Sequence, residues 1–245
     1  KISGGYQYSC MISEDGNLYT WGYNNYGQLG DNTITRRFDK PVIVQNMNDS
    51  DSVYCGHNST YVIRDGNVYA WGRNNHGQLG IGNLVDTGSP QKVLGVSGEG
   101  YLANVIQLAP GNEFVLALMN DGTVYSWGYN NYGQLGDLTV GNRTTPVRVK
   151  GVNNVGFLTD IIDICASGNH SIALKRDGTV YAWGYNGYGQ LGDSTTRTSG
   201  TPVQVRGVDN KGVLSDIVGI ACGGNFSVAL RNDGVVHAWG HNNYG

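Results

Sequence analysis

Short apolar segments separated by Asp-Gly turns recur along the whole chain. The turns lie at residues 15–16, 65–66, 121–122, 177–178 and 233–234, and each is followed by an apolar segment that ends in Trp-Gly. An Asp-Gly pair between two apolar runs is a strong hairpin signal, because such turns need residues that tolerate positive φ. Each period therefore predicts at least one β-hairpin.

The second strand of each predicted hairpin is apolar on both faces. In the first period Leu18 and Thr20 alternate with Tyr19 and Trp21, and the later periods repeat this pattern. A strand with two apolar faces belongs to a sheet that is covered on both sides, as the blades of a propeller are.

Two further strands are expected in each period. Upstream of the hairpin lie segments such as IIDICASG at 161–168, and a small residue stands ten positions before each turn Asp: Gly5, Cys55, Gly111, Ser167 and Gly223. Small side chains let inner strands converge on an axis. Pro-led segments at 41–44, 90–93, 146–149 and 202–205 suit an outer edge, because Pro has no N–H to donate.

The Trp residues of the hairpins are spaced by 50, 56, 56 and 56 residues. A fixed period in this range is typical of a solenoid, an array or a propeller. Four short strands per period without helical periodicity predict an all-β fold, a β-propeller of four-stranded antiparallel blades. We expect one propeller over residues 1–245, incomplete at one or both ends, with five repeats at 1–47, 48–97, 98–153, 154–209 and 210–245.

A ten-residue motif begins at each of these Trp residues. It reads WGYNNYGQLG at 21–30, WGRNNHGQLG at 71–80, WGYNNYGQLG at 127–136, WGYNGYGQLG at 183–192 and WGHNNYG at 239–245. The large Trp ring suits the gap between adjacent blades, the Leu the next interface, and the Asn and Gln amides the polar groups of the loop itself. The predicted structural residues are Trp21, Trp71, Trp127, Trp183 and Trp239.

The third and sixth positions of the motif vary and are the candidate binding residues. The third position holds Tyr23, Arg73, Tyr129, Tyr185 and His241, and the sixth holds Tyr26, His76, Tyr132, Tyr188 and Tyr244. Tyr and Arg are enriched at binding hot spots, because they combine contact area with a polar group. The alternative is that these side chains only cap neighbouring blades, and the sequence leaves both interpretations open.

Charge and motif content exclude several other functions. The net charge is −3 with no basic run, which disfavours nucleic acid as a partner, and no apolar run approaches the roughly 18 residues of a membrane span. No catalytic motif or metal-ligand spacing occurs, so we expect no enzyme activity, no metal and no cofactor. The four cysteines form no C-x-x-C pair, and we expect small buried thiols, while spacing alone leaves their disulfide state open: Cys10, Cys55, Cys165 and Cys222.

The recurring pattern D-G-x-V-Y-x-W-G-x-N-x-x-G-Q-L-G, followed by T-P-V-x-V, resembles the regulator of chromosome condensation repeat over essentially the whole chain. Insertions such as GVNNVGFLTDI at 151–161 are similar to the bacterial branch of these repeats. The resemblance implies a propeller, usually of seven blades, that serves as a platform for other proteins. The founding member of this family is a nucleotide exchange factor for a small GTPase.

Three functions follow, in order of preference. The first is a non-catalytic protein-binding scaffold that uses loops on the propeller rim. The alternative is a glycan-binding, lectin-like propeller, in which Tyr and Asn at equivalent rims contact sugars with a multivalent gain. A guanine nucleotide exchange factor ranks third, because near-equal repeats offer no unique protruding loop. We expect an extracellular or cell-surface location rather than a cytoplasmic one.

Five repeats where the family usually has seven predict an arc whose first and last blades do not touch. The first period has no Pro-led segment ahead of its inner strand, so we expect its blade to lack an outer strand. Apolar faces of the terminal blades would then favour self-association.

Overall fold

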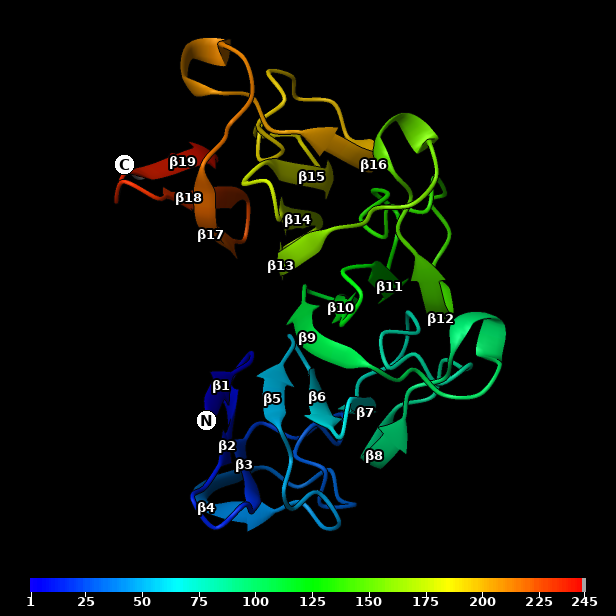
Figure 1. Ribbon diagram of the computed structural model, residues 1–245. Helices are drawn as coiled ribbons and strands as arrows, with labels where there is room; N and C mark the ends of the chain where they lie inside the picture. The colour runs from blue at the N-terminus through cyan, green and yellow to red at the C-terminus, as the bar shows by residue number, and fades with distance from the viewer. Residues whose placement is uncertain (244–245) are drawn as a thin grey trace.

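Five antiparallel sheets stand side by side in an arc in the computed structural model, which describes residues 1–243 (Figure 1). Four sheets have four strands and the last has three, and in every sheet consecutive strands of the chain pair in order. Each sheet is therefore one propeller blade. The predicted all-β propeller is confirmed, and the first and last blades lie at separate ends of the arc (Figure 1).

The blades follow one another in chain order along the arc. They consist of β1 (Ile2–Gly4), β2 (Tyr8–Ile12), β3 (Leu18–Gly22) and β4 (Arg37–Ile43); β5 (Ser52–Cys55), β6 (Ser59–Arg64), β7 (Asn67–Gly72) and β8 (Thr87–Lys92); β9 (Val105–Pro110), β10 (Phe114–Met119), β11 (Val124–Gly128) and β12 (Arg143–Arg148); β13 (Ile161–Ser167), β14 (His170–Lys175), β15 (Val180–Gly184) and β16 (Ser199–Gln204); β17 (Ile217–Gly223), β18 (Phe226–Arg231) and β19 (Val236–Gly240).

Three one-turn 3-10 helices, which the sequence did not predict, interrupt the insertions between blades. They are η1 (Val96–Gly98), η2 (Val152–Asn154) and η3 (Val208–Asn210). The helix η1 contacts β12 and η2 contacts β16, so each of these insertions packs beside the outer strand of the blade that follows it.

The first strand of each blade lies on the inner side of the arc, as predicted, and contacts the first strand of the next blade (Figure 1). In the second blade, however, Gly56 and not Cys55 occupies the position of the small residue. Its N–H donates to Ser59 O at 2.7 Å, as that of Gly5 does to Tyr8 O at 2.9 Å. The hairpin of this blade pairs Arg64 with Asn67 and is one residue shorter, so counting back from the turn Asp misplaces the residue.

The Pro-led segments form the fourth, outer strand of each blade, as predicted, but they pair with the strand that precedes them. In the first blade Tyr19 of β3 is opposite Ile43 of β4, so this blade is complete and the expected loss of its outer strand is wrong. The blade without a fourth strand, within residues 1–243, is the last one. The chain runs directly from the motif loop into the outer strand, which keeps both in one blade.

The motif joins each blade to the next through its Trp. The Trp127 indole N–H donates to Gln78 O at 2.9 Å, and that of Trp183 donates to Gln134 O at 2.9 Å, both in the motif of the preceding blade. Gly136 has a φ of +68°, and a Cβ there would lie 2.8 Å from Trp183 Nε1. The motif glycine therefore leaves space for the Trp of the neighbouring blade.

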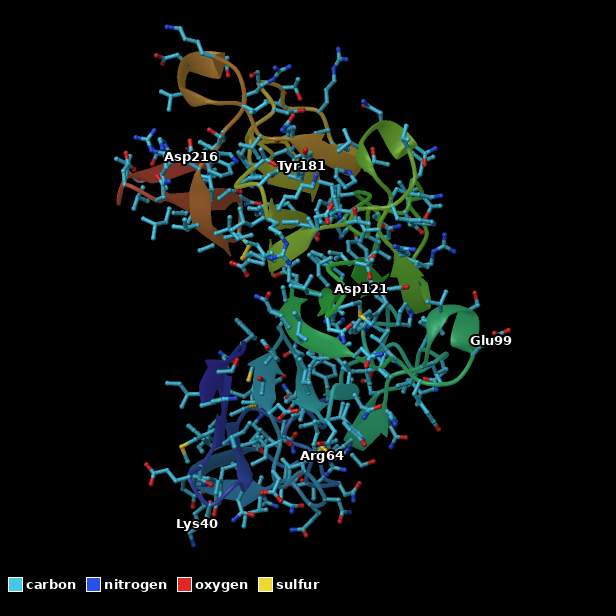
Figure 2. The ribbon with its side chains drawn as sticks, in the orientation of Figure 1. Lys40, Arg64, Glu99, Asp121, Tyr181 and Asp216 are labelled. Carbon is cyan, nitrogen blue, oxygen red and sulfur yellow. A yellow bond between two sulfur atoms is a disulfide. The ribbon has the colours of Figure 1, made fainter. Side chains whose placement is uncertain are left out.

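The burial of the five Trp side chains depends on their place in the arc. Trp71, Trp127 and Trp183 are fully buried, whereas Trp21 and Trp239 are only partly buried. The prediction that all five are buried is therefore wrong for the two terminal blades. Within residues 1–243, no other blade packs against the outward side of the first blade, which carries Trp21, and Trp239 belongs to the blade that has three strands there. Side chains fill the spaces between neighbouring blades (Figure 2).

Cysteines lie at blade boundaries at both ends of the arc. Cys165 in β13 and Cys222 in β17 form a disulfide, so the expectation of four free thiols is wrong for this pair (Figure 2). Adjacent inner strands bring the two sulfurs together, which no spacing along the chain could indicate. Cys10 and Cys55 are free thiols, and Cys10 is buried as expected.

Candidate functional site

The motif loops, which follow the Trp-Gly of each motif, lie on one face of the propeller. The backbone N–H at the third motif position always donates to a carbonyl in the turn between the first two strands of its blade. These bonds run from Tyr23 to Gln7 (2.9 Å), Arg73 to Asn58 (3.0 Å), Tyr129 to Glu113 (2.8 Å), Tyr185 to Asn169 (2.9 Å) and His241 to Asn225 (2.9 Å). We call this the motif face.

Hydrogen bonds within each loop hold the variable side chains in place. The Asn130 side chain accepts from Leu135 N at 3.0 Å and donates to Thr139 O at 3.0 Å and to Gly141 O at 3.1 Å. Gln134 Oε1 accepts from Tyr132 N at 3.0 Å. The predicted role of the motif amides is confirmed, and the loops are rigid supports rather than open segments.

A buried carboxylate stabilises the same loop from the other side. Asp137 accepts hydrogen bonds from the Thr139 hydroxyl at 2.7 Å and from Arg143 Nε at 2.8 Å. Burial alone would raise the pKa of Asp137, but these hydrogen bonds hold it below its ordinary value. The loop therefore keeps a charged, paired carboxylate at neutral pH.

The variable side chains of the motif form a continuous row along the motif face. The sixth position of one blade contacts the third position of the next: Arg73 lies over the Tyr26 ring at 5.1 Å, and ring centroids are 4.9 Å apart for His76–Tyr129, 5.0 Å for Tyr132–Tyr185 and 4.5 Å for Tyr188–His241. Within blades the third and sixth rings are 6.5 Å apart for Tyr23–Tyr26, 6.3 Å for Tyr129–Tyr132 and 6.1 Å for Tyr185–Tyr188.

We call these nine residues the aromatic row: Tyr23, Tyr26, Arg73, His76, Tyr129, Tyr132, Tyr185, Tyr188 and His241. The tenth candidate, Tyr244, lies outside the described residues. The structure thus brings nine sequence-predicted residues together. Their contacts cross every blade boundary, yet Tyr132 and Tyr188 remain 36% and 47% exposed. A side chain of the aromatic row can therefore pack against the neighbouring blade and still contact a partner.

An acidic residue that the sequence analysis missed anchors the middle of the aromatic row. Glu113, in the turn between β9 and β10, contacts Arg73 at 2.6 Å and His76 at 2.7 Å. Asn142 also contacts the His76 ring, at 3.2 Å. The available signal was that Glu113 is the one acidic residue among the five equivalent turn positions, which otherwise hold Gln or Asn.

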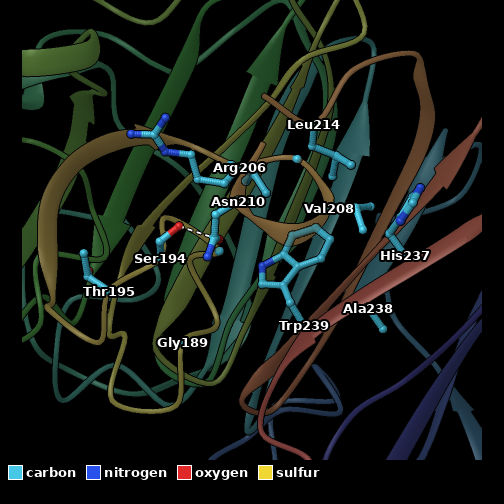
Figure 3. A pocket seen from close by; sticks show the side chains of 13 residues that line it. Gly189, Ser194, Thr195, Arg206, Val208, Asn210, Leu214, His237, Ala238 and Trp239 are labelled. Atoms are coloured by element: carbon cyan, nitrogen blue, oxygen red, sulfur yellow. Dashed lines mark hydrogen bonds between the residues drawn. The ribbon is translucent and has the colours of Figure 1, made fainter. Parts of the chain in front are cut away.

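A cavity of about 390 Å³ lies between the last two blades, beside Trp239, His237 and Leu214 (Figure 3). It adjoins the three-stranded blade, and the Trp residues of the complete middle blades are fully buried. We therefore attribute this cavity to the three-stranded form of the last blade within residues 1–243 and give it no binding role.

Two other kinds of site are absent from residues 1–243. There, no group of three His, Cys, Asp or Glu side chains lies close enough together to hold a metal ion. No helix in this described part of the chain is long and apolar enough to cross a membrane.

The sequence profile of the RCC1-like domain matches residues 1–245. The ultraviolet-B receptor UVR8 of Arabidopsis thaliana is 29% identical over 244 residues, which cover 100% of this chain and 41% of that protein. The chain thus spans less than half the length of this relative.

Solved structures of other proteins are also similar to this chain. Human WBSCR16 has a TM-score of 0.81 and 26% identity, covering 98% of this chain and 61% of that one. Yeast RCC1 (Prp20), in its structure bound to Kap60, has a TM-score of 0.65 and 19% identity, covering 98% and 69%. The last likeness concerns the fold alone.

Proposed function

Because the chain belongs to the RCC1-like domain family over its whole length, we propose that it is a non-catalytic scaffold that binds a partner protein on the motif face. The propeller of this family is mainly a fold for protein interaction. The partner would contact the aromatic row, most of all Tyr132 and Tyr188, which are its most exposed tyrosines.

The observation that carries this proposal is the continuity of the row across all blade boundaries. Tyr rings offer large contact area at a low cost in conformational entropy, and their hydroxyls can bind polar groups of a partner. Neighbouring rings hold one another in place, which lowers the entropic cost of ordering these side chains on binding. Yeast RCC1 has the same fold and was solved in complex with another protein, Kap60.

Replacing Tyr132 with alanine is expected to weaken partner binding by about 10- to 30-fold, because the change removes a ring from the centre of the row. Tyr132 contacts Tyr129 and Tyr185, so the neighbouring rings also lose support. The partner is first captured from extracts of the source organism on the immobilised chain. The dissociation constant is then measured with the purified partner by calorimetry.

Tyr101→Ala is the matched control, since Tyr101 is 58% exposed and lies in the insertion ahead of β9, outside the motif and the aromatic row. It is expected to leave the affinity unchanged. Equal affinity of the wild-type and Tyr132→Ala chains would contradict the proposal. A glycan bound by the wild-type chain on a glycan array and lost with Tyr132→Ala would favour the lectin-like alternative instead.

We propose that the protein is extracellular or on the cell surface, as expected from the sequence. The cysteines support this proposal. The Cys165–Cys222 disulfide is of the kind that persists in oxidising compartments such as the cell exterior. Mass spectrometry of the protein isolated with its thiols blocked tests this, and a fully reduced pair in the native protein would contradict it.

A further inference from the structure

A second pair of cysteines meets between the first two blades. Cys10 lies in β2 of the first blade and Cys55 in β5 of the second, and their sulfur atoms are 2.9 Å apart. A disulfide bond is about 2.0 Å long, so the two sulfurs need to approach by only about 0.9 Å. The strands that carry them already pack together, because β5 contacts both β1 and β2.

The strand registers place this pair at the same blade boundary position as the existing disulfide. Cys55 is opposite Thr60, which is opposite Trp71, and Cys222 is opposite Ser227, which is opposite Trp239. Cys55 and Cys222 are therefore equivalent residues of their blades.

The partner of each of these cysteines comes from the blade before it. Cys165 is opposite Ile172, and its equivalent in the first blade is Ser3, opposite Cys10. Ser3 holds Cys55 in place, since its hydroxyl accepts from Cys55 N at 2.9 Å. In the first blade the cysteine is therefore in the second strand, β2, opposite Ser3 of the first strand. The sulfur of Cys55 nevertheless lies 2.9 Å from that of Cys10.

We propose that Cys10 and Cys55 form a second disulfide between blades, by exchange with a small-molecule disulfide such as oxidised glutathione. Cys55 is only partly buried, whereas Cys10 is inaccessible to solvent. Cys55 therefore reacts first and Cys10 resolves the mixed disulfide.

The exchange proceeds in two steps that balance. The Cys55 thiolate attacks one sulfur of oxidised glutathione, which forms a mixed disulfide and releases one glutathione thiolate. Cys10 then attacks Cys55 Sγ as its proton passes to the departing glutathione sulfur, which releases the second glutathione as a thiol and leaves the Cys10–Cys55 bond. Two protein thiols are oxidised while one oxidised glutathione becomes two reduced molecules.

The pKa values of the two thiols agree with this order. Burial alone would raise the pKa of Cys55, but hydrogen bonds from Cys10, Ser3 and Tyr8 bring it below the ordinary value. Burial raises the pKa of Cys10 well above that value. The sulfur of Cys55 is thus the better nucleophile at neutral pH.

The test uses the full chain, first kept in reduced glutathione that leaves Cys165–Cys222 intact and then moved to oxidised glutathione. Free thiols are alkylated after unfolding and the peptides are mapped by mass spectrometry. We expect the two alkylated residues to disappear together and a linked Cys10–Cys55 peptide to replace them. The midpoint temperature of unfolding should rise by about 5 °C or more, since the new bond closes a loop across two blades.

Two variants separate the roles of the sulfurs. Cys10→Ser should stop at the mixed disulfide and carry one glutathione on Cys55, and Cys55→Ser should leave Cys10 unmodified in the folded protein. Recovery of Cys10 and Cys55 as separate alkylated or glutathionylated residues in the wild-type chain would overturn the proposal. So would a linkage of either residue to Cys165 or Cys222 alone.

Discussion

Replacing Trp127 with alanine is expected to lower the free energy of unfolding by about 3–5 kcal/mol. The ring is fully buried in a cluster with Tyr61, Leu79 and Val115, and its N–H donates to Gln78 O at 2.9 Å. Alanine would leave a cavity between the second and third blades and would remove one of the two hydrogen bonds that Gln78 O accepts, while that from the Tyr61 hydroxyl remains. Urea unfolding followed by circular dichroism measures the loss.

Trp21→Ala is the matched control for this prediction. Trp21 occupies the same motif position but is only partly buried, because no other blade of residues 1–243 packs against that side of the first blade. Its replacement should cost less than about 2 kcal/mol, since less apolar area leaves water there on folding. Equal losses for the two variants would contradict the idea that contact with the preceding blade makes the Trp structural.

The repeating parts of the fold could be predicted because every blade packs between neighbouring blades in the same way. Asp-Gly turns, strands apolar on both faces, and a Trp at a fixed distance from the turn reappear whenever a blade needs two neighbours. The same argument identified the variable motif positions as the place for a site, since their side chains differ between blades that share most other letters of the motif. Nine of the ten candidates do lie together, although their binding role stays a prediction.

Features that depend on contacts between blades could not be predicted in this way. Glu113 reaches Arg73 and His76 across a blade boundary, and Cys165 reaches Cys222 from one inner strand to the next. Such pairs arise from the curvature of the arc, which brings residues about one period apart into contact. The assignment of each Pro-led strand to its blade also needed the registers, because the sequence pattern fits either neighbour.

One buried position differs between blades in a way that predicts pH dependence. His170 is opposite Gly184, and Phe114 and Phe226 take the same place opposite Gly128 and Gly240. His170 is fully buried, with its Nε2 at 3.1 Å from Ser227 Oγ. Burial lowers the pKa of His170 from 6.5 to about 4. The folded protein therefore keeps this ring neutral at pH values where the unfolded chain protonates it.

Replacing His170 with phenylalanine is expected to remove a loss of stability that the wild-type chain suffers in acid. Above pH 6.5 the ring is neutral in both states and has no effect on the pH dependence. Between pH 6.5 and about 4 only the unfolded state binds the proton, so wild-type stability falls as the pH falls. Over this window the loss amounts to about 3 kcal/mol.

Below about pH 4 both states bind the proton and the effect is complete. Urea unfolding of the wild-type and His170→Phe chains at a series of pH values from 7 to 4 measures the difference, since carboxylates contribute equally to both curves. The variant should gain stability relative to the wild type as the pH is lowered, and folding is expected because Phe fills this position in two other blades. Two curves that stay parallel down to pH 4 would contradict the prediction, and would mean that water reaches the ring and lets it protonate in the folded state.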